Sequence, residues 1–171
     1  MHFQCFTILS LAALSVALPA SLKTRQAGVF QATTFNDISI AGGQAGNAEA
    51  EATAALSGLD LNDLANVSQA DLDFLNEVNQ VANDAEKEAF NPAVEAATGA
   101  AADAAQNGKI KNKVLKLMAT VIKLQAQEAQ GQDVAAKLAE ETTKLNNNIA
   151  TDEANAGQES TAVPFEGAIS A

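Results

Sequence analysis

Five lysines lie close together in one basic stretch of the sequence. Their type and spacing make them the strongest candidate for a binding site in the chain. They are Lys109, Lys111, Lys113, Lys116 and Lys123. No acidic residue lies between Asp103 and Glu128. Clustered ammonium groups can pair with acidic neighbouring helices and fix their arrangement, can bind acidic glycans or phospholipid head groups, or can form a partner-binding face. Structural pairing is the commonest of these roles, and the other two stay open.

The residues that usually carry catalysis are missing from the part of the chain that we expect to fold. The only histidine is His2, the only cysteine is Cys5 and the only arginine is Arg25, while Trp and Tyr are absent. Zinc and copper sites use His or Cys, and nucleophilic triads need a base that is normally His. A glycosidase needs paired carboxylates in a cleft, and the acids here are expected on outer faces. We therefore expect no enzyme activity, no metal site and no cofactor.

The first residues have the pattern of a secretory signal peptide. An apolar run at 3–18 contains small residues suited to cleavage after Ala17. This run is too short to span a bilayer, and Pro19 interrupts it. Residues 18–25 look like a short pro-segment, with a second processing step after Arg25. We expect both segments, 1–17 and 18–25, to be removed from a secreted, extracellular protein that either stays at the cell wall or diffuses away.

Charge narrows the range of partners. The full chain carries a net charge of −11, and losing Lys23 and Arg25 from its ten basic residues leaves eight lysines against 21 acids, a net charge of −13. So acidic a chain does not favour nucleic acid or anionic membranes. No second apolar segment follows the first, so we expect no transmembrane anchor in the mature chain. Without cysteine, its stability must come from an apolar core.

Periodicity predicts an all-α fold, an antiparallel bundle of about four to five helices at residues 46–150. An extended arm at 26–45 precedes the bundle and a flexible tail at 151–171 follows it. The helix with the lysines has the clearest pattern, because its apolar residues step by four and three like the seam of a bundle helix. These seam residues are Ile110, Val114, Leu117, Val121 and Leu124.

Several residues predict where the helices begin and end. Ser68 is expected to cap a long helix, with Asp71 completing a variant capping box. Asn91-Pro92 marks either a kink or the start of another helix. Asn107-Gly108 is expected to end an alanine-rich helix, and Gly131 to end the lysine-bearing one.

Three apolar residues in the arm, Phe35, Ile38 and Ile40, are candidates for docking it on the bundle, and Pro164-Phe165 is a candidate docking point in the tail. Asn66-Val67-Ser68 is a sequon for N-linked glycosylation, and its occupancy stays open.

Three stretches carry a resemblance to known proteins. They lie at 34–48, 83–92 and 108–115 and read TFNDISIAGGQAGNA, NDAEKEAFNP and GKIKNKVL. Together with the leader and the Arg25-Gln26 junction, they resemble a group of small secreted proteins of filamentous ascomycete fungi, a resemblance that implies no reaction and no catalytic residue. In architecture alone, the chain is also similar to the hydrophobic-surface-binding proteins of moulds, which are secreted, helical and poor in cysteine.

We therefore expect a secreted, non-enzymatic fungal protein that acts by contact. Its role would be that of a cell wall component, a surface-adsorbing protein or a host-directed effector, and its partner a protein, a glycan or an apolar surface. The alternative is an extracellular carrier of lipid or of another small apolar ligand, because amphipathic bundles can open around such molecules.

Overall fold

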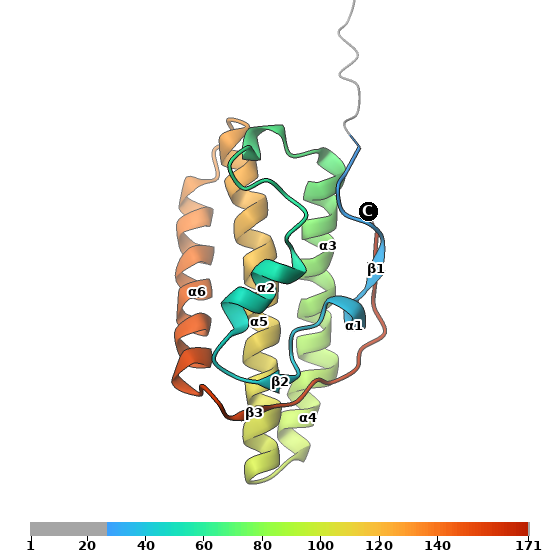
Figure 1. Cartoon of the computed structure of the whole chain (residues 1–171), viewed down its shortest axis with the longest axis vertical. Helices are drawn as coiled ribbons and strands as arrows, with labels where there is room; N and C mark the ends of the chain where they lie inside the picture. Colours follow the sequence, from blue (N-terminus) through green and yellow to red (C-terminus); the bar gives the residue numbers. More distant parts are fainter. Residues whose placement is uncertain (1–26, 171) are drawn as a thin grey trace, which may run out of the picture.

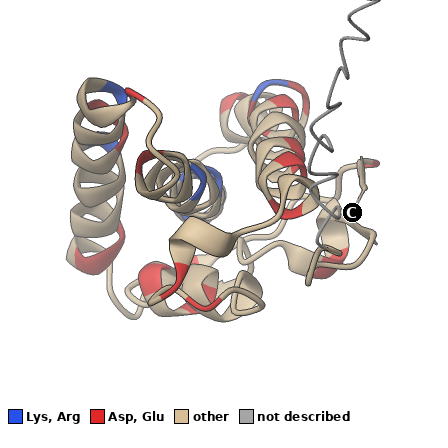
Figure 2. Ribbon diagram, turned by 90° about the horizontal axis from the view of Figure 1, so that it is seen from above, with Lys and Arg blue, Asp and Glu red and all other residues tan. Residues whose placement is uncertain are grey.

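A computed structural model describes residues 27–170 and confirms the all-α fold. Its centre is a row of three long helices, α3 (Gln69–Ala85), α5 (Ala100–Ala129) and α6 (Ala135–Ala154), with α5 in the middle (Figure 1). The short helix α2 (Ala48–Ala55) and the amino-terminal arm lie across one face of this row (Figure 2). The predicted cleavage sites after Ala17 and Arg25 fall outside the described residues.

The helix α3 begins where the sequence predicts. The chain then stays helical through Asn91-Pro92, where the sequence predicts a kink or a new helix. The Ser68 side chain accepts a hydrogen bond from the Asp71 backbone N–H, so the predicted cap is confirmed. A π-helical turn, η2 (Glu86–Phe90), follows directly, and α4 (Asn91–Ala96) continues from it with proline in its first turn. The Asn91 N–H bonds to the Glu86 oxygen five residues back, so the chain stays helical into α4, and the π turn lies close before Pro92, which has no amide to donate.

The prediction that Asn107-Gly108 ends a helix is wrong. The break lies at residues 97–99, where Ala97 is extended and Gly99 has a φ of +57°. The helix α5 runs through Asn107 and Gly108 without interruption. Gly108 lets a distant segment approach, because a Cβ at this position would overlap the Thr161 carbonyl oxygen. The Asn107 amide donates to the Glu159 carbonyl oxygen over 2.9 Å. Both residues therefore dock the carboxyl-terminal segment on α5.

The prediction of a flexible tail at 151–171 is wrong over its described part. The helix α6 continues to Ala154, and the segment beyond it pairs with the arm in two short antiparallel ladders. Strand β1 (Thr33–Thr34) pairs with β4 (Ala168–Ile169), and β2 (Gly43–Gln44) pairs with β3 (Glu159–Ser160). The tail is held because these strands satisfy one another's backbone groups and bury Ile169.

The arm is docked, as predicted, but it is not extended throughout. One helical turn, α1 (Phe35–Ile38), follows Thr34, whose hydroxyl accepts from the Asp37 N–H. The Phe35 side chain is buried and meets the Phe165 ring edge-on, with 5.9 Å between the ring centroids. The predicted docking point at Phe165 is therefore confirmed.

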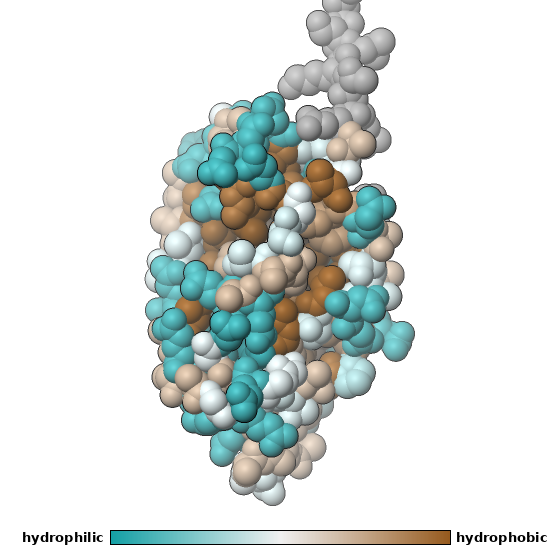
Figure 3. All heavy atoms as spheres, in the orientation of Figure 1, coloured by the Kyte–Doolittle hydropathy of each residue, from teal (hydrophilic) through white to brown (hydrophobic). Residues whose placement is uncertain are grey.

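Every predicted seam residue of α5 is buried, and three of them, Val114, Leu117 and Val121, lie in the main core with side chains of α2, α3 and α6. Phe30 stacks on Phe74 with ring centroids 4.3 Å apart, which anchors the start of the arm. On the face that carries α2, apolar side chains gather in the upper half among hydrophilic ones (Figure 3). Over residues 27–170, no helix combines the length and apolar character needed to cross a membrane.

Candidate functional site

The structure divides the five lysines of α5 into one buried residue and four partly exposed ones. Lys111 is fully buried and points toward α2 and β2. The other four lie on one stripe of the helix at steps of three, four and seven residues. They are Lys109, Lys113, Lys116 and Lys123. The predicted contact face is therefore corrected, because Lys111 is not part of any surface.

Lys111 holds the arm and α2 against α5. Its Nζ donates to the carbonyl oxygens of Gly42 and Gln44 over 2.7 and 3.1 Å, and it lies 2.7 Å from a carboxylate oxygen of Glu51. These three contacts match the three donors of an ammonium group. Burial of this charge is tolerated because it is paired and fully hydrogen-bonded. The role is structural, as the commonest interpretation of the lysines predicts.

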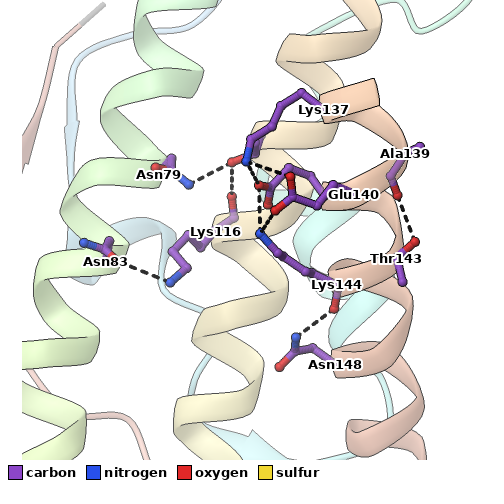
Figure 4. Close-up of polar contacts among 11 residues, drawn as sticks. Asn79, Asn83, Lys116, Lys137, Ala139, Glu140, Thr143, Lys144 and Asn148 are labelled. Carbon is purple, nitrogen blue, oxygen red and sulfur yellow. Dashed lines mark hydrogen bonds and ion pairs between the residues drawn. The ribbon is translucent and has the colours of Figure 1, made fainter. Parts of the chain in front are cut away.

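Two lysines of this stripe, Lys113 and Lys116, line a groove between α3 and α6, over α5. A cavity of about 280 Å³ opens there. Asparagines and lysines make up most of its lining, with one apolar residue from α5. Figure 4 shows five of the lining residues, Asn79, Asn83, Lys116, Lys144 and Asn148. The lining residues are Asn79, Asn83, Lys113, Lys116, Leu117, Glu141, Lys144 and Asn148. The groove exists because α3 and α6 each pack on α5 along its sides and leave the stripe between them uncovered.

On the α3 side, the groove is closed by an ion pair. The Lys116 Nζ lies 2.5 Å from a carboxylate oxygen of Glu86, and it donates to the Asn83 side-chain oxygen over 3.4 Å. Both charged side chains are less than one fifth exposed. Glu86 is the first residue of the π turn η2, and π turns are frequent at functional sites. Lys116 is therefore neutralised by a partner within the protein.

On the α6 side, four charges form a network that the sequence analysis did not single out. Lys144 contacts Glu140 and Glu141 at 2.5 and 3.2 Å, and Lys137 contacts Glu141 and Glu140 at 2.7 and 3.4 Å (Figure 4). Their spacing of three and four residues along a helix was the available signal.

Hydrogen bonds set the pKa values within this network. The hydrogen bond from Lys144 lowers the pKa of Glu140. Burial acts to raise the pKa of Glu141, but hydrogen bonds from both lysines outweigh it, so the pKa falls. Hydrogen bonds to the two glutamates raise the pKa of Lys137 and of Lys144. All four groups therefore stay charged at neutral pH.

Lys113 differs from its neighbours in the groove. It makes no hydrogen bond or ion pair with any residue in the range 27–170, although it lines the cavity. Lys109 also has no such partner among those residues, but it does not line the cavity. Lys123 donates to the Asn76 side-chain oxygen over 2.8 Å. Of the predicted contact lysines, Lys113 is thus the one that combines a place in the groove with an ammonium group available to a ligand.

The predicted glycosylation site is exposed. Asn66 is the last residue of a 3₁₀ turn, η1 (Leu64–Asn66), and its amide donates to the Asp63 carboxylate over 2.9 Å. Ser68 of the same sequon is buried as the cap of α3. Modification of Asn66 stays a prediction. Across the described part of the chain, no three His, Cys, Asp or Glu side chains converge on a position that could hold a metal ion.

Residues 30–164 match the family described as "Domain of unknown function (DUF8454)". The chain belongs to this family. The match covers the arm from Phe30, every helix of the row and the pairing of β2 with β3, so it includes the groove and all of its lining residues. No curated protein and no solved structure matches the chain.

Proposed function

We propose that this chain is a secreted, non-enzymatic protein that acts by contact, and that the groove between α3, α5 and α6 is its contact site. The observation that carries the proposal is the free ammonium group of Lys113 in a polar groove of a strongly acidic protein. A cation that no group of the protein neutralises attracts an anionic partner at short range.

The chemistry of the groove supports binding rather than catalysis. General acid–base catalysis works best with a group whose pKa lies near the working pH. In the groove the pKa of Glu141 is lowered and that of Lys144 is raised, away from neutrality in both cases. Their pairing favours fixed charges over proton transfer.

The lining also helps to rank the candidate partners. Lysines and asparagine amides favour an anionic, hydrogen-bonding partner, such as an acidic glycan or an acidic protein surface, over an apolar surface. The alternative role as a lipid carrier gains no support from this groove, since Leu117 is its one apolar lining residue. The proposal places the partner at the cell wall or in a host tissue, and the same contact chemistry applies in each.

Capture from a cell wall or host extract tests the contact site. Wild-type protein is compared with Lys113→Glu, and with Lys109→Glu as the matched control on the same stripe of α5. Neither lysine has a partner among residues 27–170, so neither change removes an internal contact. Lys111 is left unchanged because it is buried. We expect Lys113→Glu to lose captured material that Lys109→Glu retains. Equal capture by all three proteins would remove the groove as the contact site.

The mass of the extracellular protein tests secretion. We expect an amino terminus created by cleavage after Ala17 or after Arg25, and therefore a protein without His2 and Cys5. A functional extracellular molecule that keeps both residues would contradict this part of the proposal. Turnover of a substrate by the purified protein would contradict the non-enzymatic role.

A further inference from the structure

We infer that the groove between α3, α5 and α6 binds a carboxylated sugar, namely the uronic acid unit of a short acidic glycan. The inference rests on the proposed function, because it names the ligand class of the same site. The inference is based on the charge balance of the groove, its unused hydrogen-bonding groups and the size of the cavity.

The charge balance of the groove matches one carboxylate. Lys116 is neutralised by Glu86, and Lys144 shares the network of Glu140 and Glu141. Lys113 is the one lysine of the lining without an ion-pair or hydrogen-bond partner among residues 27–170. A carboxylate brings one negative charge, whereas a phosphate monoester brings about 1.5 to 2 at neutral pH.

The asparagines of the groove indicate that the ligand also donates hydrogen bonds. The Asn79 amide nitrogen donates to the Thr120 hydroxyl over 2.7 Å, and that of Asn148 donates to the Lys144 carbonyl over 2.8 Å. The side-chain oxygens of these two asparagines accept no hydrogen bond from the described residues. Free acceptors beside a free cation suit a ligand that carries hydroxyl donors next to its carboxylate. A uronic acid has both groups on one ring.

The size of the cavity fits a single ring. Its volume of about 280 Å³ lies just below the lower end of the roughly 300–1,000 Å³ of most ligand pockets. Leu117 offers the ring one apolar contact at the bottom of the groove. A protein partner would be expected to insert an aromatic or aliphatic anchor into an apolar pocket, and this lining provides no such pocket.

The charge of the whole molecule limits the length of the glycan. A net charge of −13 in the mature chain repels a long polyanion. The chain end of an acidic glycan, or a short oligouronate, brings fewer charges near the acidic surface than a long chain does. The inference therefore concerns a short chain or a chain end.

A titration with galacturonic acid trimer tests the inference on the purified full-length protein. Binding is measured by calorimetry and by NMR shifts of the asparagine side-chain amides. The methyl ester of the same trimer keeps the hydroxyls and removes the charge. Inorganic phosphate and vesicles containing phosphatidylserine represent the other anions.

We expect the trimer to bind the wild-type protein and to shift the amides of Asn79 and Asn148. Loss of one charge-assisted hydrogen bond should weaken binding about tenfold or more in Lys113→Ala, while Lys109→Ala should stay within about twofold of wild type. We expect the methyl ester, phosphate and the vesicles to bind at least tenfold more weakly than the trimer.

Four results would overturn the inference: no binding of the trimer, equal binding of the methyl ester, equal affinity of Lys113→Ala, or stronger Lys113-dependent binding of phosphate or vesicles. None of these would by itself remove the proposed function. A partner captured from an extract in a Lys113-dependent way would still support a contact role with a different ligand.

Discussion

Replacing Gly108 with alanine should destabilise the protein, against the usual effect of this change in a helix. Alanine inside a helix is favoured over glycine by roughly 1 kcal/mol. In α5, however, the new Cβ would overlap the Thr161 carbonyl oxygen and lie 3.3 Å from that of Ala41. Both oxygens belong to the backbone, so no side-chain rotation relieves the contact.

The size of the effect follows from what must move. Relief of the overlap requires the segment around Thr161 to leave α5. This breaks the hydrogen bonds from the Thr161 N–H to the Ala104 oxygen at 3.0 Å, from Asn107 to Glu159 at 2.9 Å and from Ser160 to Ala41 at 2.6 Å. At about 1 kcal/mol each, their loss outweighs the helical gain and leaves a net destabilisation of about 2 kcal/mol. For a chain of this size, that lowers the Tm by about 4–8 °C.

Urea unfolding and thermal unfolding, both followed by circular dichroism, measure this change. Gln106→Ala is the matched control, because residue 106 lies exposed on the same helix. Its free energy of unfolding should stay within about 0.5 kcal/mol of wild type. If Gly108→Ala instead raised the stability by about 1 kcal/mol, the packing of the tail on α5 would be refuted, because the helical preference would then act unopposed.

Three further changes test other contacts. Lys111→Met should lower the free energy of unfolding by about 2–3 kcal/mol, measured by urea titration, because it strands two part-buried carbonyls and Glu51, whose side chain is one third exposed. Glu141→Gln should cost less than about 1 kcal/mol at pH 7. Because the folded-state pKa of Glu141 is lowered, its contribution is present above the ordinary carboxyl pKa and is lost as the pH falls through the folded value, so the two stability curves should converge in acid. Asn66→Gln should abolish any mass loss on enzymatic deglycosylation of the extracellular protein; a loss of the same size in this variant would place the glycan elsewhere.

The features that sequence could predict depend on residues close together in the chain. The seam of α5 is visible because burial on one helical face repeats every three or four residues, from Ile110 to Leu124. The cap at Ser68 is visible because its partner is three residues away. The lysine cluster is equally local, so the sequence alone identifies the helix that carries the groove's free cation.

The features that sequence missed depend on distant partners. Asn107-Gly108 has the composition of a helix end. Its actual role, which is to hold the segment at Glu159 and Thr161 against α5, depends on residues some 50 positions away. Lys111 is indistinguishable by type from Lys113, two residues on, and its burial is set by carbonyls of the arm. The asparagines of the groove come from two other helices, so their convergence on α5 follows only from the packing of the row.

Pairing of β1 with β4 and of β2 with β3 also fixes the order of events during biosynthesis. The ribosome makes the arm first, yet the partner strands of the arm lie at residues 159–169. The last helix of the row ends at Ala154, and both partner strands of the arm lie after it. Neither ladder can therefore close until its partner strand, at residues 159–160 or 168–169, has been made and has left the ribosome, so the arm has no strand partner during most of the chain's synthesis.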